Sequence, residues 1–233
     1  MTAAIALSGI AAAFFYATLP VTQGRPLSAL APHQVFGAGV LGVDASTFVL
    51  IALSAVFVGS EFTSGMIQTT ATLTPDRTRF LTAKLLTIGA AVLIIGVLAA
   101  ALCILVTVVA GGLVSMTPAE LFPAENIRLA AGSVAMPVVY AILAATGTFV
   151  FRSAALGALV PLAIMAIGGV AEWFGAGFGA MVTPLLPVSA IHSLTGTASG
   201  HEAIGLGWAF VSLAAWIAIA SLAAGRRLTR RDI

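Results

Sequence analysis

Charged residues are scarce in this chain. Only 8% of its 233 residues are charged and 60% are hydrophobic, whereas a soluble domain carries about 25% charged residues. So few polar side chains cannot coat a core of this size in water, which excludes a soluble globular domain. A disordered chain and a nucleic-acid-binding protein are excluded as well, despite a pI near 9.2.

Cysteine and lysine are almost absent. Cys103 is the single cysteine, so an intramolecular disulfide and a cysteine-based metal site are excluded, and we interpret Cys103 as a small buried hydrophobe. Lys84 is the single lysine and follows Ala83. Because no Gly-Lys pair exists, the chain has no P-loop to cradle nucleotide phosphates, and we expect no catalytic residues on it.

What the chain has instead is long apolar runs. A membrane-spanning helix needs about 20 apolar residues, and these runs are too long for soluble strands and lack the alternation of a membrane barrel. The sequence therefore predicts an all-α, polytopic integral membrane protein with six transmembrane helices in a single transmembrane domain, 1–233. The predicted spans are about 2–19, 35–58, 83–113, 128–151, 154–174 and 203–224.

Prolines indicate where the predicted helices end or bend. The first run is expected to end at Pro20, and Pro137 and Pro161 are expected to bend the fourth and fifth spans. No basic residue precedes the first run, so it does not have the form of a cleaved signal peptide.

Basic residues predict the orientation. If the C-terminus is cytoplasmic, only Arg25 and Arg128 fall on outer segments, and eight basic residues fall on inner ones, as the positive-inside rule requires. Both termini are then cytoplasmic. Nine arginines against one lysine, in a chain rich in Ala and Gly, suggest a bacterial source with a high GC content, and we therefore expect the chain in a bacterial plasma membrane. The inner basic residues are Arg77, Arg79, Lys84, Arg152, Arg226, Arg227, Arg230 and Arg231.

Acids and histidines are few within or beside the spans. Asp44 is the one acid inside a span; it is interpreted as a carboxylate near the positive end of the second helix, and a role in a transport path is the alternative. Glu172, His192, His201 and Glu202 fall in or beside the outer segment between the last two spans. Their spacing matches no metal signature, so we expect solvated groups and no metal. No serine or cysteine nucleophile has a defined partner, which disfavours an intramembrane hydrolase.

The connection between the second and third spans carries the most information. It begins at Glu61, and Thr74-Pro75-Asp76 is expected to form a turn because proline cannot continue a helix. A short interfacial helix, about Ser64 to Leu73, is one interpretation. An ordinary loop with basic anchors is the other, and composition alone does not decide between them.

This connection resembles the signature of the type-2 ABC transporter permeases, in which an acidic and an aromatic residue precede a glycine and a Thr-Leu-rich turn, followed by proline, spaced arginines and Ala-Lys. The run from Leu185 to Ala190 is similar, more weakly, to the outer segment that precedes the last span in that family. The matching residues of the connection are Glu61, Phe62, Gly65, Met66, Ile67, Thr70, Leu73, Pro75, Arg77, Arg79, Ala83 and Lys84.

The resemblance implies a partner and a mechanism. Such permeases pair into homo- or heterodimers in the lipid membrane and bind ATPase subunits on separate chains, where ATP and Mg are held. A cytoplasmic coupling helix, Ser64 to Thr72 here, would dock on the ATPase, with Glu61 at its hinge and the basic residues pairing with ATPase acids or lipid phosphates. The implied coupling residues are Glu61, Phe62, Ser64, Gly65, Met66, Ile67, Thr70, Arg77, Arg79 and Lys84.

The outer segment 175–200 is apolar and rich in glycine, which fits a re-entrant or a surface-lying hairpin. In the family that the chain resembles, an extracellular re-entrant segment of this kind caps the cavity between the two permeases. Leu185, Leu186 and Pro187 are expected to form part of an outer gate there. One departure concerns the start of the chain, because permeases of this family usually begin with a basic interfacial helix and this sequence enters an apolar run almost at once.

Polar span residues suggest a substrate class. The expected path has a polar wall on the fourth span within apolar surroundings, which suits export of an apolar or amphipathic molecule such as a lipid, a peptide antibiotic or a drug. An ion-coupled transporter that uses Asp44, or a membrane scaffold that binds no ATPase, are the alternatives. The wall residues are Ser133, Tyr140, Thr146 and Thr148.

Overall fold

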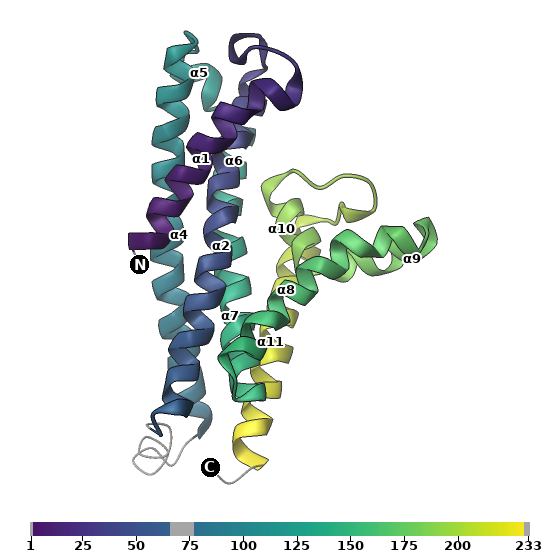
Figure 1. The fold of residues 1–233 in the computed structure, drawn as a ribbon. Helices are drawn as coiled ribbons and strands as arrows, with labels where there is room; N and C mark the ends of the chain where they lie inside the picture. Colours follow the sequence, from purple (N-terminus) through teal and green to yellow (C-terminus); the bar gives the residue numbers. More distant parts are fainter. Residues whose placement is uncertain (1, 66–76, 231–233) are drawn as a thin grey trace.

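The computed structural model describes residues 2–65 and 77–230, and within these ranges the chain forms helices and loops without strands. Figure 1 shows their arrangement. The helices in chain order are α1 (Thr2–Gln23), η1 (Leu27–Ala29), α2 (Pro32–Thr63), α4 (Arg77–Leu113), α5 (Pro118–Leu121), α6 (Ala124–Ser133), α7 (Ala135–Phe151), α8 (Ala154–Ala171), η2 (Glu172–Phe174), α9 (Ala176–Val182), η3 (Thr183–Leu185), α10 (Pro187–Thr195), η4 (Gly200–Glu202) and α11 (Leu206–Arg230).

The described residues hold six helical segments that are long and apolar enough to cross a membrane, in agreement with the predicted number and the helical class, and a seventh if the bent pair Gly177–Leu185 and Pro187–Thr195 is counted as one span. They are α1, α2, α4, α8, α11 and the joined α6 and α7. Most begin or end several residues away from the predicted limits. The 32 residues of α2 and the 37 of α4 measure about 48 and 56 Å. Both lengths exceed the thickness of a hydrocarbon core, which is about 30 Å.

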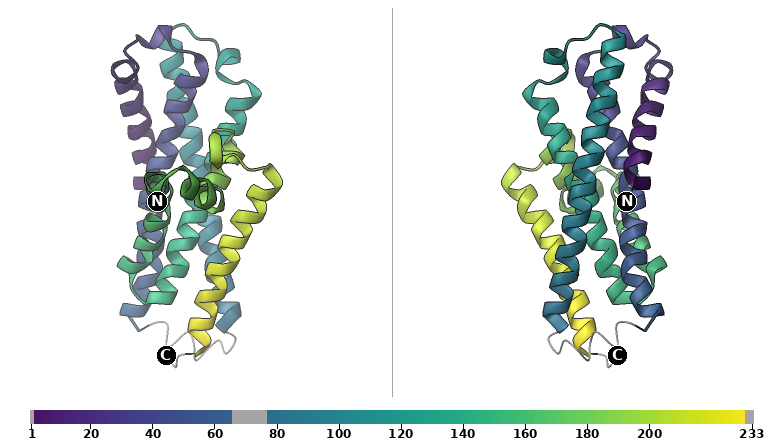
Figure 2. Two further views of the ribbon diagram at one scale, coloured as in Figure 1. Left: turned by 90° about the vertical axis from the view of Figure 1, so that its right-hand side faces the viewer. Right: turned by 90° about the vertical axis from the view of Figure 1, so that its left-hand side faces the viewer.

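The two longest helices set the shape of the bundle. In Figure 1, α2 and α4 run its full height, α1 lies along the upper part, and α8 and α11 lie along the lower part. Figure 2 shows the start of α1 at mid-height and the end of α11 at the bottom. We call the bottom, where α2 ends and α4 begins, the junction end. The largely buried α7 packs against α2, α4, α8 and α11, whereas α1, α8 and α11 expose most of their apolar surface.

Helix α1 corrects one prediction. It continues through Pro20 to Gln23 and does not end at Pro20. Proline removes a single N–H group, and this loss falls in the last turns of the helix. The helix ends instead where Gly24 adopts a φ of +63°, and the Arg25 N–H then donates to the carbonyl of Pro20 at 3.2 Å.

The other two prolines behave differently from each other. The fourth span is interrupted at Val134, between α6 and α7. Pro137 lies three residues further on and lacks the N–H that would bond to the Ser133 carbonyl, which accounts for the interruption. In contrast, α8 passes through Pro161 as one helix.

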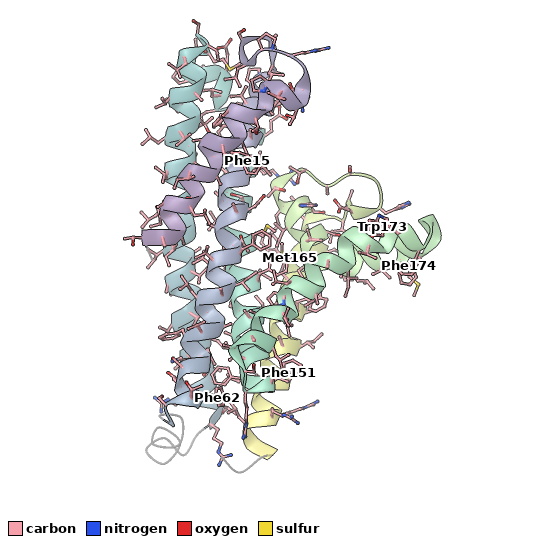
Figure 3. The ribbon with its side chains drawn as sticks, in the orientation of Figure 1. Phe15, Phe62, Phe151, Met165, Trp173 and Phe174 are labelled. Carbon is pink, nitrogen blue, oxygen red and sulfur yellow. The ribbon has the colours of Figure 1, made fainter. Side chains whose placement is uncertain are left out.

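The segment before α11 is helical but sharply bent. Residues Gly177–Leu185 and Pro187–Thr195 meet at 76°, as a broken span or a re-entrant segment would. Trp173 follows α8 and Trp208 lies in the first turn of α11, and the two are 82% and 71% exposed. Both tryptophans therefore lie on the surface at the ends of their spans, and Figure 3 shows Trp173 away from the junction end.

Candidate functional site

An ion pair joins the end of α2 to the beginning of α4. Lys84 Nζ donates to Glu61 Oε1, and the two side chains are only 12% and 18% exposed. The ammonium group also lies over the ring of Phe57, 4.0 Å from its centroid, a cation–π contact that adds to the attraction. Glu61 and Lys84, the first and last residues of the connecting segment 61–84, are therefore held together.

Aromatic side chains connect this junction to α7. Phe62, at the end of α2, and Phe80, in the first turn of α4, both contact Phe149 edge to face, with centroids 5.9 and 6.3 Å apart. Phe149 is 1% exposed. These bulky, closely packed rings connect the ends of both helices to α7.

The last helix is attached at the same place. Arg77 donates through Nη1 to the carbonyl of Leu228 at 2.6 Å, and Arg227 donates through Nε to the carbonyl of Val150 at 3.3 Å. Both carbonyls belong to the last turns of their helices, α11 and α7, where intrahelical donors are lacking. The junction thus unites α2, α4, α7 and α11.

Part of the predicted coupling segment is described. Ser64 caps α2 by donating its N–H to the carbonyl of Ser60 at 3.0 Å, and Gly65 follows with a φ of +70°, which favours glycine. Ser64 and Gly65 therefore terminate α2, and the predicted short helix does not begin at Ser64. Arg79 lies in the first turn of α4. Outside the described residues lie Met66, Ile67 and Thr70.

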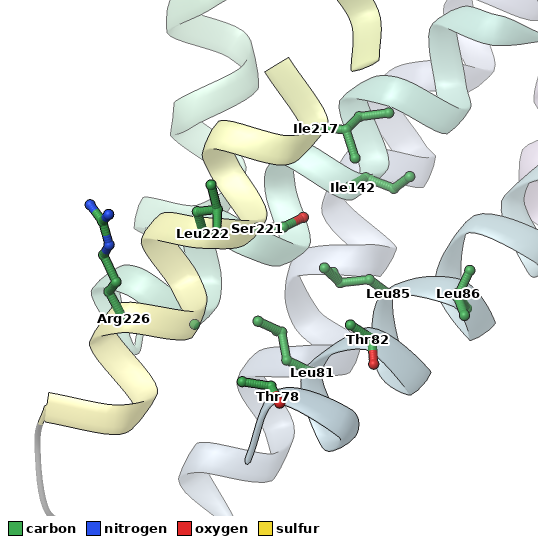
Figure 4. A pocket seen from close by; sticks show the side chains of 11 residues that line it. Thr78, Leu81, Thr82, Leu85, Leu86, Ile142, Ile217, Ser221, Leu222 and Arg226 are labelled. Atoms are coloured by element: carbon green, nitrogen blue, oxygen red, sulfur yellow. The ribbon is translucent and has the colours of Figure 1, made fainter. Parts of the chain in front are cut away.

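A groove of about 560 Å³ opens beside the junction, between α4, α7 and α11 (Figure 4). Its walls are mostly aliphatic, and three hydroxyl side chains and Arg226 are placed among them. The groove offers an apolar surface with few polar groups. Its lining is Thr78, Leu81, Thr82, Leu85, Leu86, Ile142, Ile217, Ser221, Leu222, Gly225 and Arg226.

The four residues expected to form a polar wall do not share one cavity. Ser133 lines a cavity near α10, and Thr146 lines a separate one of about 170 Å³ beside α8. Thr148 is fully buried and donates to the carbonyl of Ala144 at 2.9 Å. Tyr140 is fully buried too, and its hydroxyl lacks a partner among the described residues. A continuous path along the fourth span stays a prediction.

The three residues predicted to form part of an outer gate lie at the bend before α10. Leu185 is 65% exposed, and its carbonyl accepts a hydrogen bond from Trp216 Nε1 at 2.8 Å. Leu186 is buried and precedes α10, and Pro187 is its first residue. Proline favours the first position of a helix, where no N–H donor is needed. Leu186 and Pro187 therefore explain where the chain bends, and their role in a gate stays a prediction.

A cavity of about 410 Å³ was not predicted from the sequence. Asp44, His192 and Glu202 line it from α2, α10 and η4. Asp44 lies well inside α2, about 18 Å along the helix from Pro32, so the interpretation that it lies at the positive helix end is wrong. His192 Nδ1 is 2.9 Å from Glu202 Oε2, so these two partly exposed side chains are partners, whereas His201 is exposed as expected.

The loop after α10 brings this pair together. Gly196 ends α10 with a φ of +83°. The Ser193 hydroxyl then accepts a hydrogen bond from the Ile204 N–H at 3.1 Å, which folds the loop back so that Glu202 faces His192. His192 and Glu202 are ten residues apart and an irregular loop joins them, so no periodic pattern in the sequence predicts that they meet. Among the described residues, no three His, Cys, Asp or Glu side chains are arranged to hold a metal.

Comparison of the chain with protein-family models, with curated proteins and with solved structures finds no match in any of the three.

Proposed function

We propose that this chain is the membrane permease subunit of an ATP-driven ABC exporter in a bacterial plasma membrane, with both termini cytoplasmic. The junction of α2 and α4 is the observation that supports this most. The resemblance of residues 61–84 to a coupling segment requires that segment to be attached firmly to the transmembrane helices. The Glu61–Lys84 ion pair and the contacts of Phe62 with Phe149 provide such an attachment.

The proposed mechanism follows from these contacts. Closure of ATPase subunits on ATP and Mg would push on the connecting segment. The ion pair makes the ends of α2 and α4 move together, and the aromatic contacts pass the movement to α7. Because α7 is the most buried span, its displacement would repack the bundle and open a path for an apolar or amphipathic substrate. A second permease copy or a sister chain would cover the apolar faces of the mostly exposed helices.

Co-purification of the ATPase tests this proposal. The tagged chain is extracted from its native membrane in mild detergent, and the bound proteins are identified by mass spectrometry. We expect a P-loop ATPase in stoichiometric amount, and at least a tenfold loss of it from Ile67→Glu. The matched control is Ile127→Glu, because Ile127 is exposed on α6 at the opposite end of the bundle. A folded chain without any ATPase overturns the proposal and favours a scaffold or an ion-coupled transporter.

A further inference from the structure

The cavity beside Asp44 has a chemical character that the exporter proposal does not use. It is enclosed by α2, the break between α6 and α7, α10 and the loop after α10. Along α2, Asp44 is about 25 Å from Glu61, so the cavity lies in the half of the bundle away from the junction end. A carboxylate within an apolar span is costly and usually marks a functional site.

The ionisable side chains that line the cavity are mainly acidic. Its lining includes two carboxylates, Asp44 and Glu202, and the imidazole of His192, but no lysine or arginine. Arg128 precedes the lining residue Leu129, and its guanidinium donates to the carbonyls of Ser193 and Leu194 at the end of α10. The described residues form no hydrogen bond or ion pair with Asp44, whereas Glu202 is paired with His192.

The hydroxyl groups that line the cavity already donate their protons in hydrogen bonds within the protein. Ser133 donates to the carbonyl of Ala130 at 2.8 Å, and Thr195 donates to the carbonyl of His192 at 2.9 Å. Thr197 lies 2.8 Å from the Thr195 hydroxyl, and it is the donor because the proton of Thr195 is engaged. What remains on these oxygens is acceptor capacity. The polar part of the cavity therefore offers a ligand mainly hydrogen-bond acceptors.

A ligand that complements such a site supplies several N–H donors and a positive charge. An ammonium group has three donors and no acceptor, and its charge offsets the carboxylate of Asp44, since Glu202 is already paired with His192. The remaining walls are aliphatic and suit an apolar body. They consist of Val40, Leu41, Leu129, Met136 and Ile191.

We propose that this cavity binds an amphipathic amine in its protonated form, with the ammonium group at Asp44 and the apolar body against α2 and α7. The inference deepens the proposed function, on which it rests for the statement that such an amine is the exported substrate. The binding itself requires no ATPase. A volume of about 410 Å³ lies within the usual range of small-molecule sites.

Binding of a matched pair of fluorescent probes tests the inference. The full chain is placed in lipid nanodiscs with whatever subunits remain bound, without ATP, and titrated with dansylcadaverine. The same titration uses its neutral analogue, which lacks the terminal amine. We expect the amine to bind at least tenfold more tightly than the analogue. Asp44→Asn should abolish most of this difference, and Glu202→Gln should reduce it.

The control variant is Glu125→Gln, which removes an exposed carboxylate from the first turn of α6 and should leave both affinities unchanged. Equal binding of the two probes by the wild-type chain overturns the inference, as does an Asp44→Asn chain that still prefers the amine. If Asp44→Asn fails to fold, Glu202→Gln decides alone. Amine binding without a co-purified ATPase upholds the cavity and rejects the exporter, whereas an ATPase without amine selectivity does the reverse.

Discussion

Among single residues, Glu61 and Lys84 are the two that attach the connecting segment to the transmembrane helices. Each carries a charge into a largely buried position, 18% and 12% exposed, and each is the other's ion-pair partner. Removing one member of a buried pair leaves the second charge uncompensated, which costs more than the pair itself contributes. The pair therefore has a measurable signature.

We expect Glu61→Gln and Lys84→Met each to destabilise the chain by about 1–3 kcal/mol, measured by thermal unfolding in detergent. The double variant should lose less than the sum of the two, because neither charge is then left alone. Additive losses would contradict the ion pair. Glu125→Gln, at an exposed position, serves as the control for loss of a carboxylate.

The sequence predicted some of these residues but not their contacts. Glu61 and Lys84 were singled out by the resemblance, but their pairing depends on how α2 and α4 pack. Asp44 was predicted to lie near the positive end of its helix. That prediction was wrong because α2 begins at Pro32, three residues before the predicted span, which places Asp44 further inside the helix. His192 and Glu202 were read as solvated, because only the folded loop brings them together.

At the scale of elements, α1 and α2 approach each other through small residues. A Cβ atom added at Gly42 would lie 2.3 Å from the carbonyl oxygen of Ser8, so the two backbones are in direct contact there. Tyr16 of α1 also donates to the hydroxyl of Thr107 on α4 at 2.7 Å. Small residues allow such close helix packing in membranes.

Gly42→Ala is expected to separate α1 from α2 and lower stability by about 1–3 kcal/mol, again measured by thermal unfolding. Gly37→Ala is the matched control on the same helix, because no atom lies within 4 Å of its added Cβ. That variant should be neutral or slightly stabilising, since alanine favours helix over glycine by up to about 1 kcal/mol. Equal effects of the two substitutions would show that the close approach is absent.

Element limits were harder to predict than element types. Apolar runs identify the spans because lipid requires about 20 such residues, but α2 and α4 continue beyond their apolar runs into Glu61 and Arg77, where polar residues remain helical. The break at Val134 followed from Pro137, whereas Pro20 and Pro161 are both accommodated within helices. Proline alone therefore did not decide where a helix ends.

At the scale of the whole molecule, the two sites lie in opposite halves of the bundle. The junction of four helices is at the end where α11 finishes, and the acidic cavity lies beyond the middle, next to α10. Both include residues of α2. A movement of α2 at the junction would thus change the wall that carries Asp44, which is the relation between energy input and substrate release that an exporter needs.

Site-specific cross-linking in native membranes tests the central claim, that the junction end docks an ATPase. In a Cys103→Ala background, Ser64→Cys carries a benzophenone label at the exposed end of α2, and Ala119→Cys carries the same label at the opposite end. After illumination, the adducts are identified by mass spectrometry. We expect a P-loop ATPase cross-linked to residue 64 and not to residue 119. An ATPase adduct at both positions, or at neither, would contradict the claim.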